Sequence, residues 1–130
     1  MTTDSTFIAS ADATLAAIGS ALDAALASYS NEDGSEADNG TDWSLNDGIL
    51  EIECADGSKL IVNRHVPNRE IWVAARSGGF HFRADVGVWR DTRSGEEFAA
   101  QLTRLLRDQA GLAVDLTRLP PPLFPVSSRA

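Results

Sequence analysis

Apolar residues recur every three or four positions in two stretches of the sequence, at residues 4–29 and 98–109. This spacing gathers apolar side chains on one face of an α-helix. We therefore expect a long helix near the start of the chain and a shorter one near its end. The expected buried stripes are Phe7, Ala11, Leu15, Ile18, Leu22, Ala25, Leu26 and Tyr29 in the first helix, and Phe98, Leu102, Leu105, Leu106 and Gln109 in the second.

Residues at both ends of the second stretch favour helix boundaries. Ser94-Gly95-Glu96-Glu97 has the pattern of a capping box, in which Ser94 is the N-cap and the Glu97 side chain bonds back to the Ser94 amide. Gly111 is the expected C-cap residue. The sequence thus predicts a helix that starts directly after Ser94.

Between the helices, apolar and polar residues alternate with the period of two that is typical of β-strands. Asp47-Gly48 and Asp56-Gly57 interrupt this alternation, and such dipeptides supply the positive φ of two-residue hairpin turns. Ser77-Gly78-Gly79 turns the chain again, and Pro67 ends the third strand because proline cannot donate to a sheet. We expect a meander of six antiparallel strands, at residues 42–46, 49–54, 59–64, 70–76, 80–83 and 86–91.

Two amphipathic helices around a meander predict an α+β fold, a two-layer sandwich with both helices on one face of an antiparallel sheet of about six strands. We expect residues 1–116 to form this single domain. Residues 117–130 form a tail whose four prolines favour polyproline II. Two interpretations of the tail stay open: a disordered end, or a segment lying between the helices through Leu116, Leu119, Leu123 and Phe124.

Trp72 lies in the middle of the fourth expected strand and is the candidate partner contact. Ile71 and Val73 point to one face of that strand, while Glu70 and Trp72 point to the other. The local sequence fits both a buried and an exposed tryptophan. Because both helices should cover the face of Ile71 and Val73, we expect Trp72 on the open face, where an aromatic side chain is suited to a partner interface.

Charge is distributed unevenly along the chain. Residues 1–58 hold 12 acidic residues and no Lys or Arg, a net charge of −12, whereas residues 59–130 hold 7 acidic and 11 basic residues, a net charge of +4. The acidic half includes residues 30–42, which we expect to form a solvated loop. Phosphate binding needs clustered cations, so nucleic acid is not an expected partner. Cations or a basic protein surface fit better, although acidity also serves solubility alone.

Several classes of protein are not expected from this sequence. No stretch approaches 18 consecutive apolar residues and no signal peptide is recognisable, so we expect a cytoplasmic protein without a membrane span. The single cysteine, Cys54, fits a reducing compartment, and packing accounts for it better than nucleophilic chemistry does. His65 and His81 could share a metal only if their strands place them together. Known catalytic motifs are absent, so an enzyme is not expected.

Three stretches resemble the frataxin family, and within it the bacterial CyaY branch. They are DGSKLIVNRHVPNREIWVAA, SGGFHF and W-x-D-x-RSGEEF, and the resemblance extends over residues 4–116. It implies a small iron-binding protein that docks on the cysteine desulfurase and scaffold of iron–sulfur cluster assembly, as a regulator or iron donor. It also implies that Trp72 and Asn63 lie on the docking surface. On the same expected open face, Glu51, Glu53 and Glu70 are further candidate partner contacts.

The resemblance further implies an acidic ridge along the first helix and first strand, and this chain departs from it. Residues 18–24 read IGSALDA, and Arg83 stands where family members often have an acid. The carboxylates that remain are hard oxygen ligands, which suit weakly bound Fe²⁺ or Fe³⁺ with competition from Mn²⁺, Ca²⁺ and Mg²⁺. These candidate metal ligands are Asp4, Asp12, Asp23, Glu32, Asp33, Glu36, Asp38 and Asp42.

Three functional hypotheses follow. The first is an iron-binding regulator or iron donor without turnover of its own, monomeric except for oligomers formed with metal. The second is an acidic adaptor that binds a basic protein and no physiological metal, which the thinned ridge favours. The third is a ferroxidase or iron store, which would need a preorganised di-iron cluster such as paired Glu-x-x-His motifs, and these are absent from the sequence.

Overall fold

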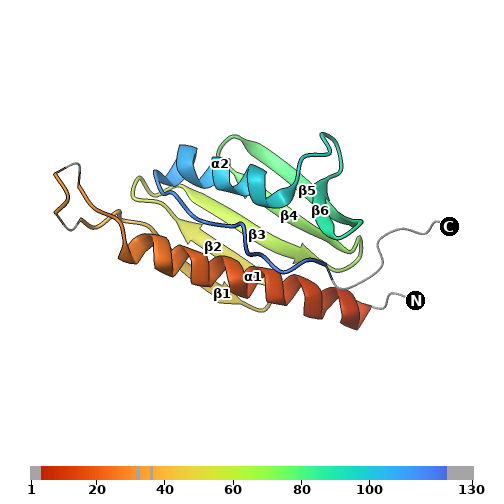
Figure 1. Ribbon diagram of the computed structural model, residues 1–130. Coiled ribbons are helices and arrows are strands. Elements are labelled where there is room, and N and C mark those ends of the chain that lie inside the picture. Colours follow the sequence, from red (N-terminus) through yellow and green to blue (C-terminus); the bar gives the residue numbers. More distant parts are fainter. Residues whose placement is uncertain (1–3, 32, 36, 123–130) are drawn as a thin grey trace.

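The computed structural model describes residues 4–31, 33–35 and 37–122 (Figure 1). A six-stranded antiparallel sheet runs in the order β1-β2-β3-β4-β5-β6, each strand pairing with its neighbour in sequence. The predicted meander and the α+β class are therefore confirmed. The elements are α1 (Asp4–Ala27), β1 (Asp42–Asn46), β2 (Ile49–Glu53), β3 (Lys59–His65), β4 (Glu70–Ala75), β5 (Gly78–Asp85), β6 (Val88–Asp91) and α2 (Phe98–Ala110).

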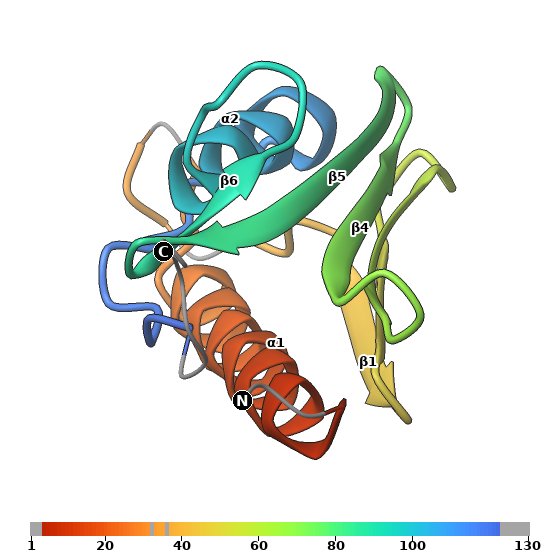
Figure 2. The same ribbon diagram turned by 90° about the vertical axis from the view of Figure 1, so that its right-hand side faces the viewer.

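Both helices lie on one face of the sheet (Figure 2). In the part of the chain that the structure describes, the opposite face carries no helix. Strand alternation explains the division, since buried and more exposed residues alternate along β2 and β3. The inner face of the three central strands is aliphatic and buried, with Leu50, Ile52, Leu60, Val62, Ile71 and Val73.

The predicted stripe of α1 is buried against this inner face from Phe7 to Leu22. α1 has 24 residues and a mean hydropathy of 1.2, which by length and composition alone would also suit a membrane-spanning helix. Core helices of soluble proteins share such a length and composition, and in this fold the apolar stripe of α1 lies in the hydrophobic core. α1 ends at Ala27, two residues earlier than the pattern predicts, and the hydroxyl of Ser28 donates to the carbonyl groups of Ala24 and Ala25.

The predicted capping box before α2 is wrong. The N-cap is Glu97, with extended backbone and no side-chain cap hydrogen bond, and the helix begins at Phe98. The Asp91 carboxylate instead accepts from the amides of Arg93 and Ser94, and Glu97 forms a β-bridge with Arg90. Because Asp91 captures these amides, residues 92–94 form a turn instead of the first turn of a helix. Gly111 is the C-cap as predicted, with φ of 64°.

Two hairpin turns also differ from the expected positions. β5 begins at Gly78, so the turn after β4 consists of Arg76 and Ser77. β6 begins at Val88, because Val86 and Gly87 both have positive φ, 48° and 84°, and form the two-residue turn after β5. The sequence pattern missed Val86 because a β-branched residue rarely adopts this conformation.

Residues 112–119, which we call the C-terminal strap, run between α1 and α2 (Figure 1). Leu112, Val114 and Leu116 are buried in the core, and Leu119 packs partly against it. For this segment the packed interpretation of the tail is the right one. Leu123 and Phe124 lie outside the described residues, and the boundary between domain and tail after residue 116 stays a prediction.

Candidate functional site

The open face of the sheet carries the residues that the sequence singled out for partner contact. Cross-strand pairing places Asn63 of β3 beside Trp72 of β4, and Trp72 beside His81 of β5. Ile71 and Val73 are buried on the opposite face, at 0% and 2% exposure, whereas Trp72 is half-buried. The predicted orientation of Trp72 is therefore the one the sheet adopts.

Two histidines stack on the indole ring of Trp72. The imidazole of His65 lies 3.5 Å from it between ring centroids, at an interplanar angle of 9°. The imidazole of His81 lies on the other side at 4.2 Å and 6°. The strands do bring both histidines to one place, but the indole lies between them. They form an aromatic stack rather than a shared metal site.

Glu70 lies in the same cluster, and its expected role as an exposed contact is wrong. Its side chain is only 4% exposed. The Trp72 indole N–H donates to Glu70 Oε1 at 2.8 Å, and Arg83 Nη2 donates to Glu70 Oε2. His81 Nδ1 lies 3.7 Å from Oε1. Neighbouring side chains from β4 and β5 thus cover and neutralise a carboxylate that belongs to the open face.

The other two candidate glutamates lie towards the β1 edge of the open face. Glu51 forms an ion pair with Lys59 at 3.0 Å, and this hydrogen bond raises the pKa of Lys59 above its ordinary value. Glu53 is exposed and pairs across the sheet with Asp42 and Lys59. Ile49, 44% exposed, lies beside Asn63. The open face therefore combines an aromatic centre with an acidic edge.

The three candidate metal ligands on α1 already have protein partners. Asp4 pairs with Arg69 at 3.1 Å, and Asp12 pairs with Arg64, whose side chain is only 17% exposed. Asp23 accepts the indole N–H of Trp43 at 2.9 Å. At 1.5 Å per residue, the eight positions between Asp4 and Asp12 correspond to about 12 Å along the helix. These carboxylates are separate anchors of α1 rather than a ligand set.

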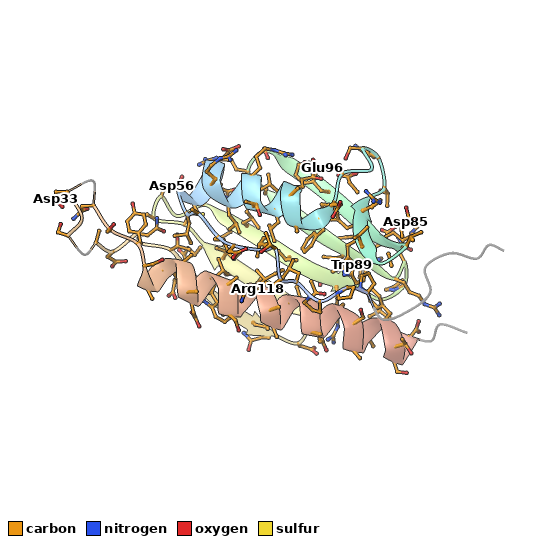
Figure 3. All side chains as sticks on the ribbon, viewed as in Figure 1. Asp33, Asp56, Asp85, Trp89, Glu96 and Arg118 are labelled. Atoms are coloured by element: carbon orange, nitrogen blue, oxygen red, sulfur yellow. The ribbon has the colours of Figure 1, made fainter. Side chains whose placement is uncertain are left out.

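The acidic loop between α1 and β1 holds the remaining candidates. Asp33 accepts from the Ser35 hydroxyl at 2.6 Å and the Ser35 amide at 2.9 Å, and these bonds lower the pKa of Asp33. Asp38 accepts from the Gly40 amide, and Asp42 from the Trp43 amide. Asp33 lies near the tip of the loop, at the opposite end of the molecule from Asp85 and Trp89 (Figure 3). Glu32 and Glu36 lie outside the described residues.

The candidate carboxylates that the structure describes do not form a preformed metal centre. Among the described residues, no group of three or more His, Cys, Asp or Glu side chains is close enough to hold one metal ion. The available ligands are single carboxylates on a loop and at a strand end. Single carboxylates do not by themselves define the coordination geometry of a metal ion.

Sequence reasoning missed the role of Arg83 and the two histidines. Glu70 and Trp72 are two residues apart on one strand, so their shared face was readable from the sequence. The pairing of Glu70 with Arg83 and of Trp72 with His81 depends on strand register. The short turn between β4 and β5 sets that register, and it was expected one residue later than it occurs.

Comparisons with known proteins agree with this architecture. The model of the frataxin-like domain matches residues 1–112, and this chain belongs to that family. A relative from Dechloromonas aromatica (strain RCB), named iron-sulfur cluster assembly protein CyaY, is 48% identical over 114 residues, covering 87% of this chain and 97% of the relative. A protein of the same name from Burkholderia mallei (strain SAVP1) is 40% identical over 111 residues, covering 85% and 94%. The solved structure of frataxin from Psychromonas ingrahamii has a TM-score of 0.69 and 28% identity, covering 90% of this chain and all of that one.

Proposed function

We propose that this protein works in cytoplasmic iron–sulfur cluster assembly as a docking regulator without turnover of its own. It binds the cysteine desulfurase and scaffold complex through the open sheet face centred on Trp72. The observation that carries this proposal is a half-exposed tryptophan on the sheet face that no helix covers within residues 4–31, 33–35 and 37–122. The names of the relatives, iron-sulfur cluster assembly protein CyaY, support the choice of iron–sulfur cluster assembly as the process.

The acidic half of the chain supports docking on a basic partner surface. Residues 1–58 carry a net charge of −12, and this half forms α1, the acidic loop, β1 and β2. Complementary charge accelerates encounter and fixes orientation, while a central aromatic side chain supplies most of the affinity. The two features therefore contribute at different stages of one docking event.

Iron enters this proposal as weakly held cargo. Asp4, Asp12 and Asp23 bond to side chains of other elements, whereas the described loop carboxylates and Asp42 bond only to residues one or two positions away, so the latter are the carboxylates left for iron. The same observation favours a second function, an acidic adaptor that binds the assembly machinery and carries no metal. The two proposals share the docking surface and differ in the metal titration described in the Discussion.

The affinity of the purified cysteine desulfurase–scaffold complex for wild type and Trp72→Ala tests the docking proposal. Loss of a central aromatic contact should cost at least about 2 kcal/mol, roughly a thirtyfold rise in Kd. Val86→Ala is the control, since Val86 is 70% exposed at the turn between β5 and β6. It should bind like wild type. Equal affinities of wild type and a folded Trp72→Ala would refute docking through this face.

A further inference from the structure

The indole ring of Trp72 is restrained on three sides. Its N–H donates to Glu70 Oε1 at 2.8 Å, and imidazole rings of His65 and His81 lie parallel to its two faces. A side chain held in this way has lost most of its rotamer freedom before any partner arrives. Affinity benefits from such preorganisation because binding then does not have to order the ring.

Glu70 is the unusual member of this cluster. Its side chain is 4% exposed although it belongs to the open face of the sheet, and Arg83 on the neighbouring strand balances its charge. Only the carboxylate of this ion pair is buried, and the cost of removing it from water offsets part of its attraction to Arg83, so the pair is weak grounds for stability. The carboxylate has two partners, the Arg83 guanidinium on one oxygen and the Trp72 indole N–H on the other, so its position and that of the indole ring are linked.

We infer that Glu70 is a positioning residue, which holds the Trp72 indole in its docking orientation while Arg83 fixes the carboxylate. This inference rests on the proposed function, since it assumes that Trp72 is the docking residue. Glu70 acts through Trp72, because its own carboxylate is covered.

The same contacts define what chemistry a partner meets at Trp72. The indole N–H is already bonded to Glu70, and an imidazole lies against each face of the ring. A partner therefore meets the carbon edge of the indole, which fits an aliphatic or proline side chain. Glu70 already occupies the position of a hydrogen-bond acceptor at the indole N–H, and the two imidazoles occupy the positions where a cation would stack on the ring.

Glu70→Leu tests the inference, because leucine fills similar volume and offers no acceptor. Arg83, whose side chain is 62% exposed, is free to turn to water in this variant. We expect Glu70→Leu to weaken docking about threefold to tenfold, the cost of ordering one side chain. Glu70→Gln should restore affinity, since its amide oxygen still accepts from the indole N–H.

The indole N–H resonance of Trp72 in ¹⁵N NMR spectra of the free protein is a second measurement. It reports the hydrogen bond to Glu70 directly, and a change in overall stability alone would not shift it. Glu70→Leu should shift or broaden it, whereas Glu70→Gln should leave it close to wild type. Asp23→Leu is the matched resonance control, because Asp23 accepts from the Trp43 indole in the same way. It should shift the Trp43 signal and leave the Trp72 signal in place.

Two outcomes would overturn the inference. One is a folded Glu70→Leu with wild-type affinity and an unmoved Trp72 resonance. If Glu70→Leu does not fold, Arg83→Ala replaces it as the test variant. The second contradicting outcome is then a Trp72 indole resonance that is the same in Arg83→Ala as in wild type. Failure of the docking proposal is distinguishable, since Trp72→Ala would then bind like wild type while the resonance still responded to Glu70→Leu.

Discussion

Gly19 of α1 lies directly against the indole ring of Trp43 in β1. A Cβ atom at position 19 would be 2.7 Å from Cη2 and 3.0 Å from Cζ3 of that ring. The ring is held by the hydrogen bond from its N–H to Asp23, one turn further along α1. The glycine thus allows α1 to approach the β1 edge of the sheet at the position where the tryptophan needs the space.

Gly19→Ala should destabilise the fold despite better helix propensity. Alanine gains about 0.8–1 kcal/mol over glycine in a helix, but overpacking costs about 1–3 kcal/mol, so a net loss of up to about 2 kcal/mol is expected. Urea denaturation measures the difference. Ser20→Ala, at the adjacent exposed position, is the control and should be neutral or slightly stabilising. If Gly19→Ala instead raised the free energy of unfolding by the full helix-propensity gain of about 0.8–1 kcal/mol, the Trp43 ring would have to move aside without cost.

Ile71→Ala and Trp72→Ala should affect different properties. Ile71 is fully buried, so its truncation leaves a cavity and should cost about 2–5 kcal/mol of stability while the folded fraction still binds its partner. Trp72→Ala should lose docking with a much smaller change in melting temperature. Thermal unfolding followed by circular dichroism separates the two. Equal unfolding of both variants would contradict the position of Trp72 on the open face, outside the core.

Docking should weaken steeply between low and physiological ionic strength. At physiological ionic strength exposed charges are screened beyond about 8–10 Å, whereas at about 0.01 M salt the screening length is about 30 Å, and the acidic half has no Lys or Arg of its own. Surface plasmon resonance across a salt series measures this, and the association rate should change most. Salt-independent binding would reduce the acidic half to a role in solubility.

Titration with Fe(II) under anaerobic conditions tests the cargo proposal. Amide signals near Asp33, Asp38 and Asp42, and those of Glu32 and Glu36, should broaden at lower metal concentration than signals near Asp23. Signals of β4 and α2 should stay sharp. If none of these amide signals changed at millimolar Fe(II), the iron-cargo proposal would be contradicted and the metal-free adaptor would be the supported function.

Asp91 should make stability depend on acidity. Burial raises the pKa of its carboxyl, but hydrogen bonds from the amides of Arg93 and Ser94 and from the Gln101 side chain outweigh burial and leave the pKa lowered. The folded state therefore binds this proton less tightly than the unfolded state. Its contribution is complete above the ordinary value of about 4 and is lost as pH falls through the lowered value.

The Asp91→Asn variant measures this contribution. At pH 7 it should be about 1–3 kcal/mol less stable than wild type, because the amides lose a charged acceptor. Urea denaturation from pH 7 down to about pH 3 should show the difference narrowing below about pH 4, where the unfolded state binds a proton that the folded state does not. A difference that stays constant over this range would contradict a lowered pKa.

The sequence predicted the parts of the fold that depend on local periodicity. The stripes of α1 and α2 follow the helical period, and the Asp-Gly turns place β1, β2 and β3 within a residue of their observed bounds. The start of α2 failed because two local signals competed. Ser94 and Glu97 match a capping box, yet the Asp91 side chain takes the nearby amides first.

The site was harder to predict because it depends on neighbours across strands. Alternation assigned Glu70 to the open face correctly, but exposure depends on what covers that face. Arg83, 13 residues away, and the Trp72 indole both bond to the carboxylate. Counting acidic residues likewise could not show that Asp12 and Asp4 are paired with arginines of β3 and of the turn after it.

The C-terminal strap has a consequence for the order in which this domain assembles. The sheet pairs only strands adjacent in sequence, so its contacts form between nearby residues. The strap contributes Leu112, Val114 and Leu116 to a core whose α1 residues come about a hundred positions earlier. Contact between strap and α1 therefore costs more chain-closure entropy than pairing of neighbouring strands does. During synthesis, α1 and the meander leave the ribosome before the strap does, so their core is incomplete until the strap is available to pack against it. Until it arrives, the groove between the helices exposes apolar surface, which makes the incomplete chain a ready substrate for chaperones.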